Sequence, residues 1–306
     1  MSDYLIGIDG GGSKTAVVLA RLDGSPMGRG EGGPSNYHAV GLENAFAALD
    51  EAISAAWMQA GIPEQPVSAV VLGMSGVDRP EDSTVFETWT ARRFPGVHVK
   101  LVNDGQIALA AGTPQGWGVV VVSGTGSIIF GQDEHGRTAR AGGWGPLFGD
   151  EGSGYRAALE AIQAVARAHD GRGPATSLTQ RVLAFFQVTA PPDLIAAVYR
   201  PENSRAEIAR LSRAVDEEAL VGDLVAQRIV QRAAEELAAG VQSVAVQQLH
   251  LQTVPIALAG GFLVHGRSLQ TAFLDRVKAI GIPLDSVDSV EEPVWGAVCL
   301  AMRMLK

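Results

Sequence analysis

The chain has 306 residues and a formal net charge of -9, with 46% hydrophobic and 19% charged residues. This composition excludes a disordered protein, and the negative charge opposes binding to nucleic acid because nothing offsets the repulsion from phosphate groups. The single cysteine, Cys299, excludes a disulfide framework or a cysteine-ligated metal site within one chain. Neither a signal-peptide pattern nor an apolar run of membrane-spanning length is evident, so we expect a cytoplasmic protein without a membrane partner.

The first predicted element is a strand that runs into a glycine-rich loop, Asp9-Gly10-Gly11-Gly12-Ser13-Lys14-Thr15. Consecutive glycines let the backbone direct its N–H groups at an anion, and the three residues after them add donors that suit phosphate. Asp9 suits a magnesium ion beside such a loop. The loop is not a Walker A loop, because Ser13 separates the glycines from Lys14, and β-branched residues follow it where a dinucleotide fingerprint needs a helix. The loop therefore joins two antiparallel strands. The alternative to a phosphate-binding loop is an ordinary glycine-rich hairpin without a ligand. The strands predicted here cover residues 4–9, 15–22 and 26–31.

The next segment alternates helices with strands, and two of the strands end in polar residues. A strand at 67–74 ends at Ser75-Gly76, and a strand at 97–102 ends at Asn103-Asp104. In open α/β sheets, ligands bind at the carboxyl ends of the strands. A carboxylate there can accept a proton from a hydroxyl that attacks phosphorus, which makes Asp104 the candidate general base. The alternative is that Asp104 or Asn103 caps the helix that follows. We expect helices at 43–60, 80–94 and 107–111.

The same order of elements then begins again. The apolar strand 119–122 runs into Ser123-Gly124-Thr125-Gly126-Ser127 and on into a second strand at 128–131. Such an internal repeat predicts two copies of one strand–hairpin–helix unit, each with a glycine-rich loop that can grip a phosphate chain. The sequence from residue 151 to about residue 246 is mostly helical in pattern. We expect these helices to be an insertion into the second unit. Expected here are helices at 155–168, after Pro191-Pro192 and at 222–248, a strand at 254–258 that ends in Ala259-Gly260-Gly261, and helices at 269–280 and 293–304.

A further loop, residues 141–152, carries an aromatic residue and two acids just before a helix. Its glycine content argues against a strand. Asp150 and Glu151 could cap the next helix, and Trp144 could be an anchor in the core, so a structural role competes with a functional one for all three.

Taken together, four motifs resemble a known family. They are Asp-Gly-Gly-Gly-Ser-Lys-Thr at 9–15, Ser-Gly-Thr-Gly-Ser at 123–127, Gly-Gly-Trp-Gly with Gly-Asp-Glu-Gly-Ser-Gly-Tyr at 142–155, and Ala-Gly-Gly at 259–261. As a set they are similar to the N-acetylglucosamine kinase branch of the BadF/BadG/BcrA/BcrD ATPase family, in the sugar kinase/Hsp70/actin superfamily, over residues 4–304. The resemblance implies an α/β, duplicated ribonuclease H-like (actin-like ATPase) fold whose two domains bind ATP in the cleft between them. The first domain is expected at 1–115 with 292–306, and the second at 116–291.

The resemblance also implies roles for individual residues. Asp104 matches the base that activates the 6-hydroxyl of the sugar. The residues that match ATP-phosphate contacts are Ser13 and Thr125, with Gly260 and Gly261 on the adenosine side. Those that match sugar contacts are Asn36, Ser127, Gly143, Trp144 and Asp150. From the loops themselves we add Gly11, Gly12, Lys14, Thr15, Gly124 and Gly126 for ATP, Ser75 for the sugar and Asp9 for Mg²⁺.

The predicted function is therefore an amino-sugar kinase that transfers phosphate from Mg-ATP to the 6-hydroxyl of N-acetylglucosamine. Two alternatives remain: a glucosamine kinase, and an ATPase activator of a reductase or dehydratase. The activator needs cysteines to hold an iron–sulfur cluster, and one cysteine in the chain argues against it. A small sugar is the expected partner, and the sequence is compatible with a homodimer without fixing the oligomeric state.

Overall fold

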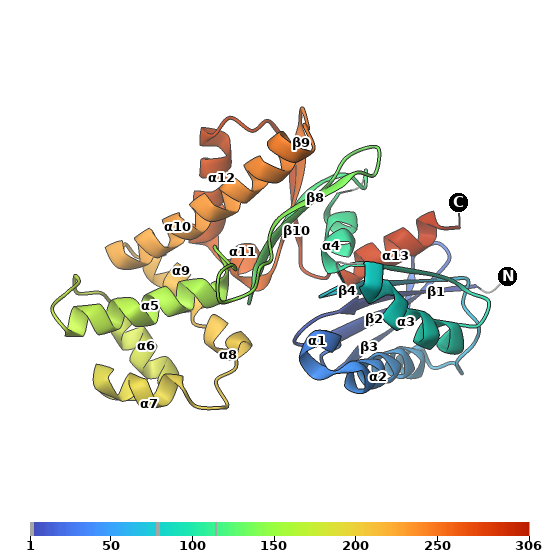
Figure 1. Cartoon of the computed structure of the whole chain (residues 1–306), viewed down its shortest axis with the longest axis horizontal. Helices are drawn as coiled ribbons and strands as arrows, with labels where there is room; N and C mark the ends of the chain where they lie inside the picture. The colour runs from blue at the N-terminus through green and yellow to red at the C-terminus, as the bar shows by residue number, and fades with distance from the viewer. Residues whose placement is uncertain (1–2, 78–79, 114, 306) are drawn as a thin grey trace. The chain divides into compact units, whose positions relative to one another are not determined.

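The computed structural model describes residues 3–77, 80–113 and 115–305, with only the backbone of Pro80, Glu81 and Ser83. The chain divides into two compact units. Unit 1 comprises Met1–Gly116 together with Glu292–Lys306, and unit 2 comprises Trp117–Glu291. The C-terminal helix, drawn in red in Figure 1, lies beside the blue N-terminal strands, so the end of the chain returns to unit 1.

Unit 1 is built on a five-stranded sheet. Its first three strands form an antiparallel meander, and the last two are added parallel to β1. In the order β3-β2-β1-β4-β5, the strands are β3 (Pro26–Gly32), β2 (Thr15–Arg21), β1 (Tyr4–Gly10), β4 (Ala69–Met74) and β5 (His98–Asn103). Because β1, β4 and β5 run in parallel, their carboxyl ends meet at one edge of the sheet.

Helices cover the unit 1 sheet. They are α1 (Tyr37–Val40), α2 (Leu42–Ala60), α3 (Pro80–Arg93), α4 (Asp104–Gly112) and α13 (Val294–Arg303). The helix α2 can lie close to β3 because glycines occupy alternate positions of that strand. A Cβ atom at Gly30 would lie 1.8 Å from the carbonyl oxygen of Ala52, a distance that no side chain tolerates. The helix α13 packs on β1 and α4.

Unit 2 repeats the sheet of unit 1. Its order, β8-β7-β6-β9-β10, has the same antiparallel meander and the same two parallel additions. The strands are β6 (Gly118–Ser123), β7 (Ser127–Gln132), β8 (Thr138–Gly142), β9 (Val254–Ala259) and β10 (Leu284–Val290). The identical order confirms the duplicated fold that the repeated strand–loop–strand pattern predicts.

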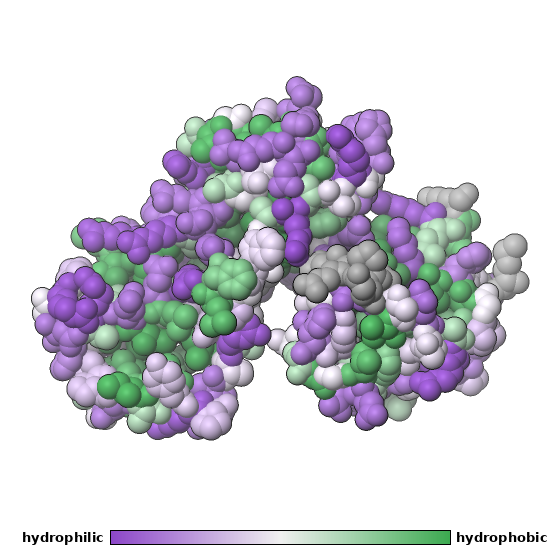
Figure 2. Space-filling view, in the orientation of Figure 1, coloured by the Kyte–Doolittle hydropathy of each residue, from purple (hydrophilic) through white to green (hydrophobic). Residues whose placement is uncertain are grey.

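The helices of unit 2 surround one large apolar core. They are α5 (Gly154–His169), α6 (Leu178–Phe186), a 3₁₀ turn (Pro191–Asp193), α7 (Leu194–Val198), α8 (Arg205–Ala209), α9 (Ser212–Leu220), α10 (Leu224–Val241), a π-helical segment (Gln242–Gln248), α11 (Gly261–His265) and α12 (Arg267–Ala279). On the visible face, hydrophilic side chains dominate and hydrophobic ones are scattered among them (Figure 2). Within the described ranges no single helix is long and apolar enough to cross a membrane, although α6 and residues 191–198 pass as a bent pair by length and composition.

Two strands differ from the sequence prediction. Residues 138–142 form β8, although the glycine-rich stretch from 141 was expected to be a loop; backbone pairing with β7 holds this edge strand despite its glycine. The strand β10 was not predicted, because most of its residues are polar and at least partly exposed, and it pairs on one side only. The helix expected at 222–248 begins after the cap Asp223 and changes to π-helix at Gln242.

Candidate active site

The glycine-rich loop of unit 1 lies at the carboxyl edge of its sheet. The register aligns Gly10 with Met74 and Met74 with Asn103, so three strand ends meet there. The loop is closed by the Gly11 N–H, which donates to the carbonyl oxygen of Lys14 at 3.0 Å. Gly12 and Ser13 are exposed at its tip. The predicted hairpin between β1 and β2 is confirmed, and its tip presents N–H groups and one hydroxyl to solvent.

Thr15 has a different position from the one we expected. Its side chain is fully buried, and its hydroxyl lies 2.7 Å from the carbonyl oxygen of Gly33 and 2.8 Å from the hydroxyl of Ser35. Ser35 in turn donates its N–H to the carbonyl oxygen of Gly11 at 3.0 Å. Thr15 therefore holds the loop from below and does not face a ligand, which corrects its assignment as a phosphate contact.

Lys14 is exposed and forms an ion pair with Glu31, with 3.2 Å between Nζ and Oε1. The two side chains are 66% and 72% exposed, and such surface pairs contribute at most about 1 kcal/mol. Lys14 can therefore leave Glu31 for a phosphate group at little energetic cost.

Two carboxylates lie close together at this edge of the sheet. Asp9 is partly buried in β1, and Asp104 is the first residue of α4. The pKa of Asp9 is raised to about 7, first by burial and then by the negative charge of Asp104, while the charge of Lys14 opposes the rise. A carboxylate whose pKa is raised in this way by a second acidic group suits a cation or a proton between the two.

The cap of α4 is provided by Asn103. Its side-chain oxygen accepts the N–H of Gly105 at 2.7 Å, and Asp104 Oδ1 accepts the same N–H at 2.9 Å. Because Asn103 satisfies the helix end, the carboxylate of Asp104 is not required for capping.

Asn36 and Ser75 are positioned by the same network. The Ser75 N–H donates to the carbonyl oxygen of Gly10 at 2.8 Å, and the Asn36 N–H donates to that of Gly11 at 3.3 Å. The Asn36 side chain caps α1 and lies beside Gly76, where an added Cβ would be 3.1 Å from its oxygen. All the residues of unit 1 that were predicted to bind a ligand, except Thr15, therefore border the carboxyl edge of one sheet.

In unit 2 the equivalent loop is Gly124-Thr125-Gly126. The Gly124 N–H donates to the carbonyl oxygen of Gly126 at 3.0 Å, and the Gly154 N–H donates to that of Gly124 at 2.8 Å. Gly260 approaches this loop from the end of β9, with a φ of +85°. A Cβ there would lie 2.5 Å from the carbonyl carbon of Ser123, so only glycine fits. The structure therefore brings Gly260 and Gly261 against Gly124.

Asp150 and Ser127 lie next to the Gly124–Gly126 loop. Asp150 is buried with a φ of 57°, and its Oδ1 accepts the N–H of Ser127 at 3.3 Å. Burial raises the pKa of Asp150, and the Ser127 N–H and two nearby arginines oppose that rise. The cap of α5 is Ser153. Asp150 is therefore free of the capping role that was its alternative explanation.

Trp144 is an exposed aromatic residue and not an anchor in the core. Its side chain is 59% exposed and lies against the ring of Phe148, with 6.5 Å between the ring centroids. The guanidinium of Arg140 lies 5.3 Å from the centroid of the Trp144 ring. Gly143 precedes it with a φ of 71°. The Trp144 ring is thus held by a cation and a second ring while more than half of the residue remains exposed.

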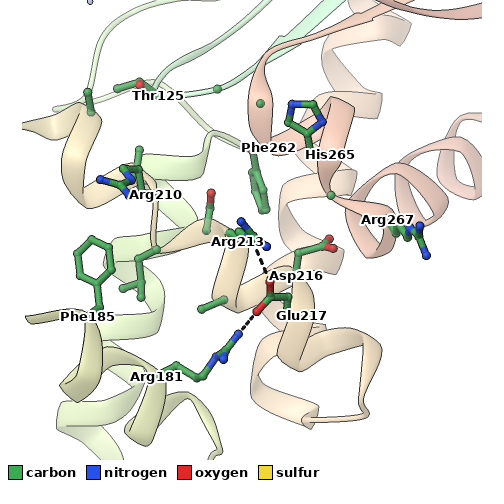
Figure 3. Close-up of a pocket in the computed structure, with 18 of the residues that line it drawn as sticks. Thr125, Arg181, Phe185, Arg210, Arg213, Asp216, Glu217, Phe262, His265 and Arg267 are labelled. Atoms are coloured by element: carbon green, nitrogen blue, oxygen red, sulfur yellow. Dashed lines mark hydrogen bonds and ion pairs between the residues drawn. The ribbon is translucent and has the colours of Figure 1, made fainter. Parts of the chain in front are cut away.

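A cavity of about 1120 Å³ lies within unit 2 and reaches Gly124, Thr125 and Gly261. Figure 3 shows Phe262 pointing into it from α11 and Glu217 lying between Arg213 and Arg181. Four arginines and two carboxylates line it, so its charge favours an anion. The charged and aromatic lining residues that the sequence did not reveal are Arg181, Phe185, Arg210, Arg213, Asp216, Glu217, Phe262, His265 and Arg267. Their signal is weak because they lie on separate helices; only Phe262, His265 and Arg267 directly follow the predicted Gly260-Gly261 turn.

The donors for a magnesium ion are carboxylate oxygens. Among the described residues no group of three or more His, Cys, Asp or Glu side chains is placed to hold a metal. Asp9 nevertheless fits Mg²⁺, because that ion can be held by a single protein carboxylate and complete its coordination with phosphate oxygens and water.

Two sheets of identical order, each with a glycine-rich hairpin at its carboxyl edge, define the class of actin-like ATPases and sugar kinases. A proposed N-acetylglucosamine kinase from Chromobacterium violaceum has the same fold, with a TM-score of 0.78 and 30% identity over 98% of this chain and 99% of that chain. The model of the BadF/BadG/BcrA/BcrD ATPase family matches residues 6–301, and the chain belongs to that family. This confirms the family that the four motifs indicate.

Two relatives match over nearly their whole length. The N-acetylmuramic acid/N-acetylglucosamine kinase of Clostridium acetobutylicum is 37% identical over 307 residues, covering 97% of this chain and 98% of the relative. The N-acetyl-D-glucosamine kinase of Dictyostelium discoideum is 34% identical over 318 residues, covering 99% of each.

Proposed function

We propose that this protein is a kinase that transfers the terminal phosphate of ATP to the 6-hydroxyl of N-acetylglucosamine. The observation that carries the proposal is the pair Asp9 and Asp104, placed beside the exposed tip of a glycine-rich loop. The two relatives with at least 34% identity, both named as N-acetylglucosamine kinases, support the acceptor.

In the proposed mechanism Asp104 accepts the proton of the 6-hydroxyl. The sugar oxygen then forms a bond to the terminal phosphorus while the bond to the leaving ADP breaks. The exposed N–H groups and hydroxyl at Gly12 and Ser13 stabilise charge on the phosphate oxygens, and Lys14 moves from Glu31 to the same anion. Thr125 and its flanking glycines bind phosphate in unit 2, and the cavity beside Gly261 takes the nucleoside.

Asp9 would hold Mg²⁺ in this proposal, directly or through water. The ion would supply positive charge that neutralises the phosphates of ATP. The contribution of the chain is to keep Asp9 near the end of a mostly buried strand.

The proposed sugar contacts are Asn36 and Ser75 in unit 1, and Ser127, Gly143, Trp144 and Asp150 in unit 2. In the structure, the Asp150 carboxylate is fixed by the Ser127 N–H, so it is pre-oriented to accept a hydrogen bond from a sugar hydroxyl. Trp144 offers the apolar face that a sugar ring needs.

A panel of sugars in an assay of ADP release tests the proposal. We expect ADP release that depends on N-acetylglucosamine, with a product phosphorylated at the 6-position by NMR. ATP hydrolysis at the same rate with and without sugar would refute the kinase and favour the activator of a reductase or dehydratase. Turnover with glucosamine alone would change the acceptor and leave the chemistry unchanged.

A second acceptor is favoured by one observation. Arg140 places a guanidinium over the face of Trp144, and a guanidinium binds carboxylates well. N-acetylmuramic acid, an amino sugar that carries a carboxylate, is named for the Clostridium acetobutylicum relative. We include it in the panel with the variant Arg140→Gln. This change should weaken the use of N-acetylmuramic acid more than that of N-acetylglucosamine, and equal loss for both would remove the case for the second acceptor.

Replacing Trp144 by alanine should raise the KM for the sugar about tenfold, because a lost aromatic contact removes on the order of 1.5 kcal/mol. The KM for ATP should change less than about twofold. Leu147→Ala is the matched control, since Leu147 is 91% exposed in the same loop and has no assigned role. Steady-state kinetics with each substrate varied in turn measure both effects. Equal increases in both KM values would assign Trp144 a structural role.

A further inference from the structure

Asp216 is a buried carboxylate that lines the unit 2 cavity and has no role in the mechanism above. It lies in α9 with 5% of its surface exposed. Its Oδ1 accepts the N–H of Leu269 at 2.9 Å, and its carboxylate also accepts the N–H groups of Arg267 and Ser268. These three donors are the first N–H groups of α12, so one helix supplies the cap of another.

The cap is needed because α12 has none of its own. The residue before α12 is Gly266, which has no side chain to accept a hydrogen bond. Burying a carboxylate is unfavourable unless hydrogen bonds compensate for the lost water. Burial raises the pKa of Asp216 even though the three N–H groups oppose the rise.

The contact between Asp216 and Gly266 also fixes α11. A Cβ at Gly266 would lie 3.0 Å from Asp216 Oδ1 and 2.2 Å from the carbonyl oxygen of Phe262, so the three groups are packed without spare room. Phe262 belongs to α11, which starts at Gly261 directly after Gly260. Gly260 in turn lies against Ser123 and Gly124. A continuous set of close contacts thus leads from Asp216 to the glycine-rich loop of unit 2, Gly124-Thr125-Gly126.

Figure 3 shows Asp216 at the wall of the cavity, between α9 and the segment that carries Phe262, His265 and Arg267. We propose that Asp216 is a positioning residue for the nucleotide, because it holds the α11–α12 segment against α9 and so sets the shape of the cavity that takes ATP. The inference rests on the proposed function, in which the cavity beside Thr125 and Gly261 binds the nucleoside.

Asp223 offers a matched control for the loss of a helix cap. It caps α10 by accepting the N–H groups of Val225 and Ala226, both at 2.9 Å, and it does not line the cavity. Asp216→Ala and Asp223→Ala each remove an aspartate that caps a helix of unit 2. Both should lower the melting temperature, and only Asp216→Ala should change how the nucleotide binds.

The experiment measures the KM for ATP, the KM for N-acetylglucosamine and the melting temperature of wild type, Asp216→Ala, Asp216→Asn and Asp223→Ala. For Asp216→Ala we expect the KM for ATP to rise by about tenfold, with the sugar KM within about twofold. Asp216→Asn keeps one acceptor oxygen and should give a smaller rise, of about threefold. In Asp223→Ala both KM values should remain within about twofold of wild type.

Parallel increases in the two KM values, or an unchanged ATP KM with a lowered melting temperature, would overturn the positioning role. If Asp216→Ala does not fold, Asp216→Asn decides the question by the same criterion. Fluorescent ADP binding to the wild type separates this inference from the proposed function. A wild type that binds no ADP refutes the nucleotide cavity itself, whereas a wild type that binds ADP no more tightly than Asp216→Ala refutes Asp216 alone.

Discussion

Replacing Asp104 by asparagine should lower kcat for N-acetylglucosamine by about 10²- to 10⁴-fold, the range that a general base contributes. The amide cannot take the proton of the 6-hydroxyl, although it has the same shape as the carboxylate. The KM for ATP should change less than about threefold, because in the proposed mechanism Asp104 acts on the hydroxyl of the sugar and not on ATP. The ADP-release assay, run with saturating sugar and then with saturating ATP, measures both quantities.

Asn103→Ala is the control for helix capping. Asn103 accepts the N–H of Gly105 at 2.7 Å, so its removal should lower the melting temperature by weakening the start of α4. Its kcat should fall far less than that of Asp104→Asn, because the carboxylate remains. A kcat within tenfold of wild type for Asp104→Asn, or the same loss in both variants, would remove Asp104 from the role of base.

The fold could be predicted well from local patterns. Apolar runs that end in glycine or polar residues marked β1, β4, β5, β6 and β9, and the repeated glycine loop indicated duplication. The strand β10 was not predicted because an edge strand with exposed polar residues on both faces has no hydrophobic periodicity. The start of α4 was placed too late, since the Asn103 cap makes the helix begin at Asp104 rather than at Ile107.

The positions of candidate site residues could be predicted where these residues lie at strand ends, and could not be predicted where they depend on packing. Asp104 and Ser13 follow directly from the ends of β5 and β1, because such ends must meet at one edge. The burial of Thr15 could not be predicted, since it depends on Ser35 returning from a distant loop. The capping role of Asp216 was not predicted for the same reason. Its hydrogen-bond partners lie in α12, and no local sequence pattern connects them to Asp216.

Replacing Asp9 by asparagine should stabilise the free protein at pH 8 and weaken its use of magnesium. In the folded chain the pKa of Asp9 is raised from 3.8 to about 7, first by burial and then by Asp104. A carboxyl with a raised pKa stabilises the fold fully only below pH 3.8; this contribution declines as pH rises and is lost above pH 7. Above pH 7 the ionised Asp9 therefore costs on the order of 4 kcal/mol, which the uncharged amide avoids.

Thermal unfolding of wild type and Asp9→Asn at pH 4, 6 and 8 measures the effect. The variant should gain stability over wild type progressively from about pH 4 to about pH 7 and hold a constant advantage above that. Glu292→Gln is the control of opposite sign in the same unit, because the hydrogen bond from Arg29 lowers the pKa of Glu292. That variant should be less stable than wild type at pH 8. An Asp9→Asn that is destabilised equally at all three pH values would contradict the raised pKa.

The gain in stability should coincide with a loss of function. A bound cation reduces the repulsion between the carboxylates of Asp9 and Asp104, and the variant has lost one of these charges. Mg-ATP should therefore raise the melting temperature of wild type more than that of Asp9→Asn. The magnesium concentration for half-maximal rate should also rise at least about tenfold in the variant, as expected when a charged ligand is lost. Equal stabilisation of both proteins by Mg-ATP would separate Asp9 from the metal and leave its buried charge without a functional reason.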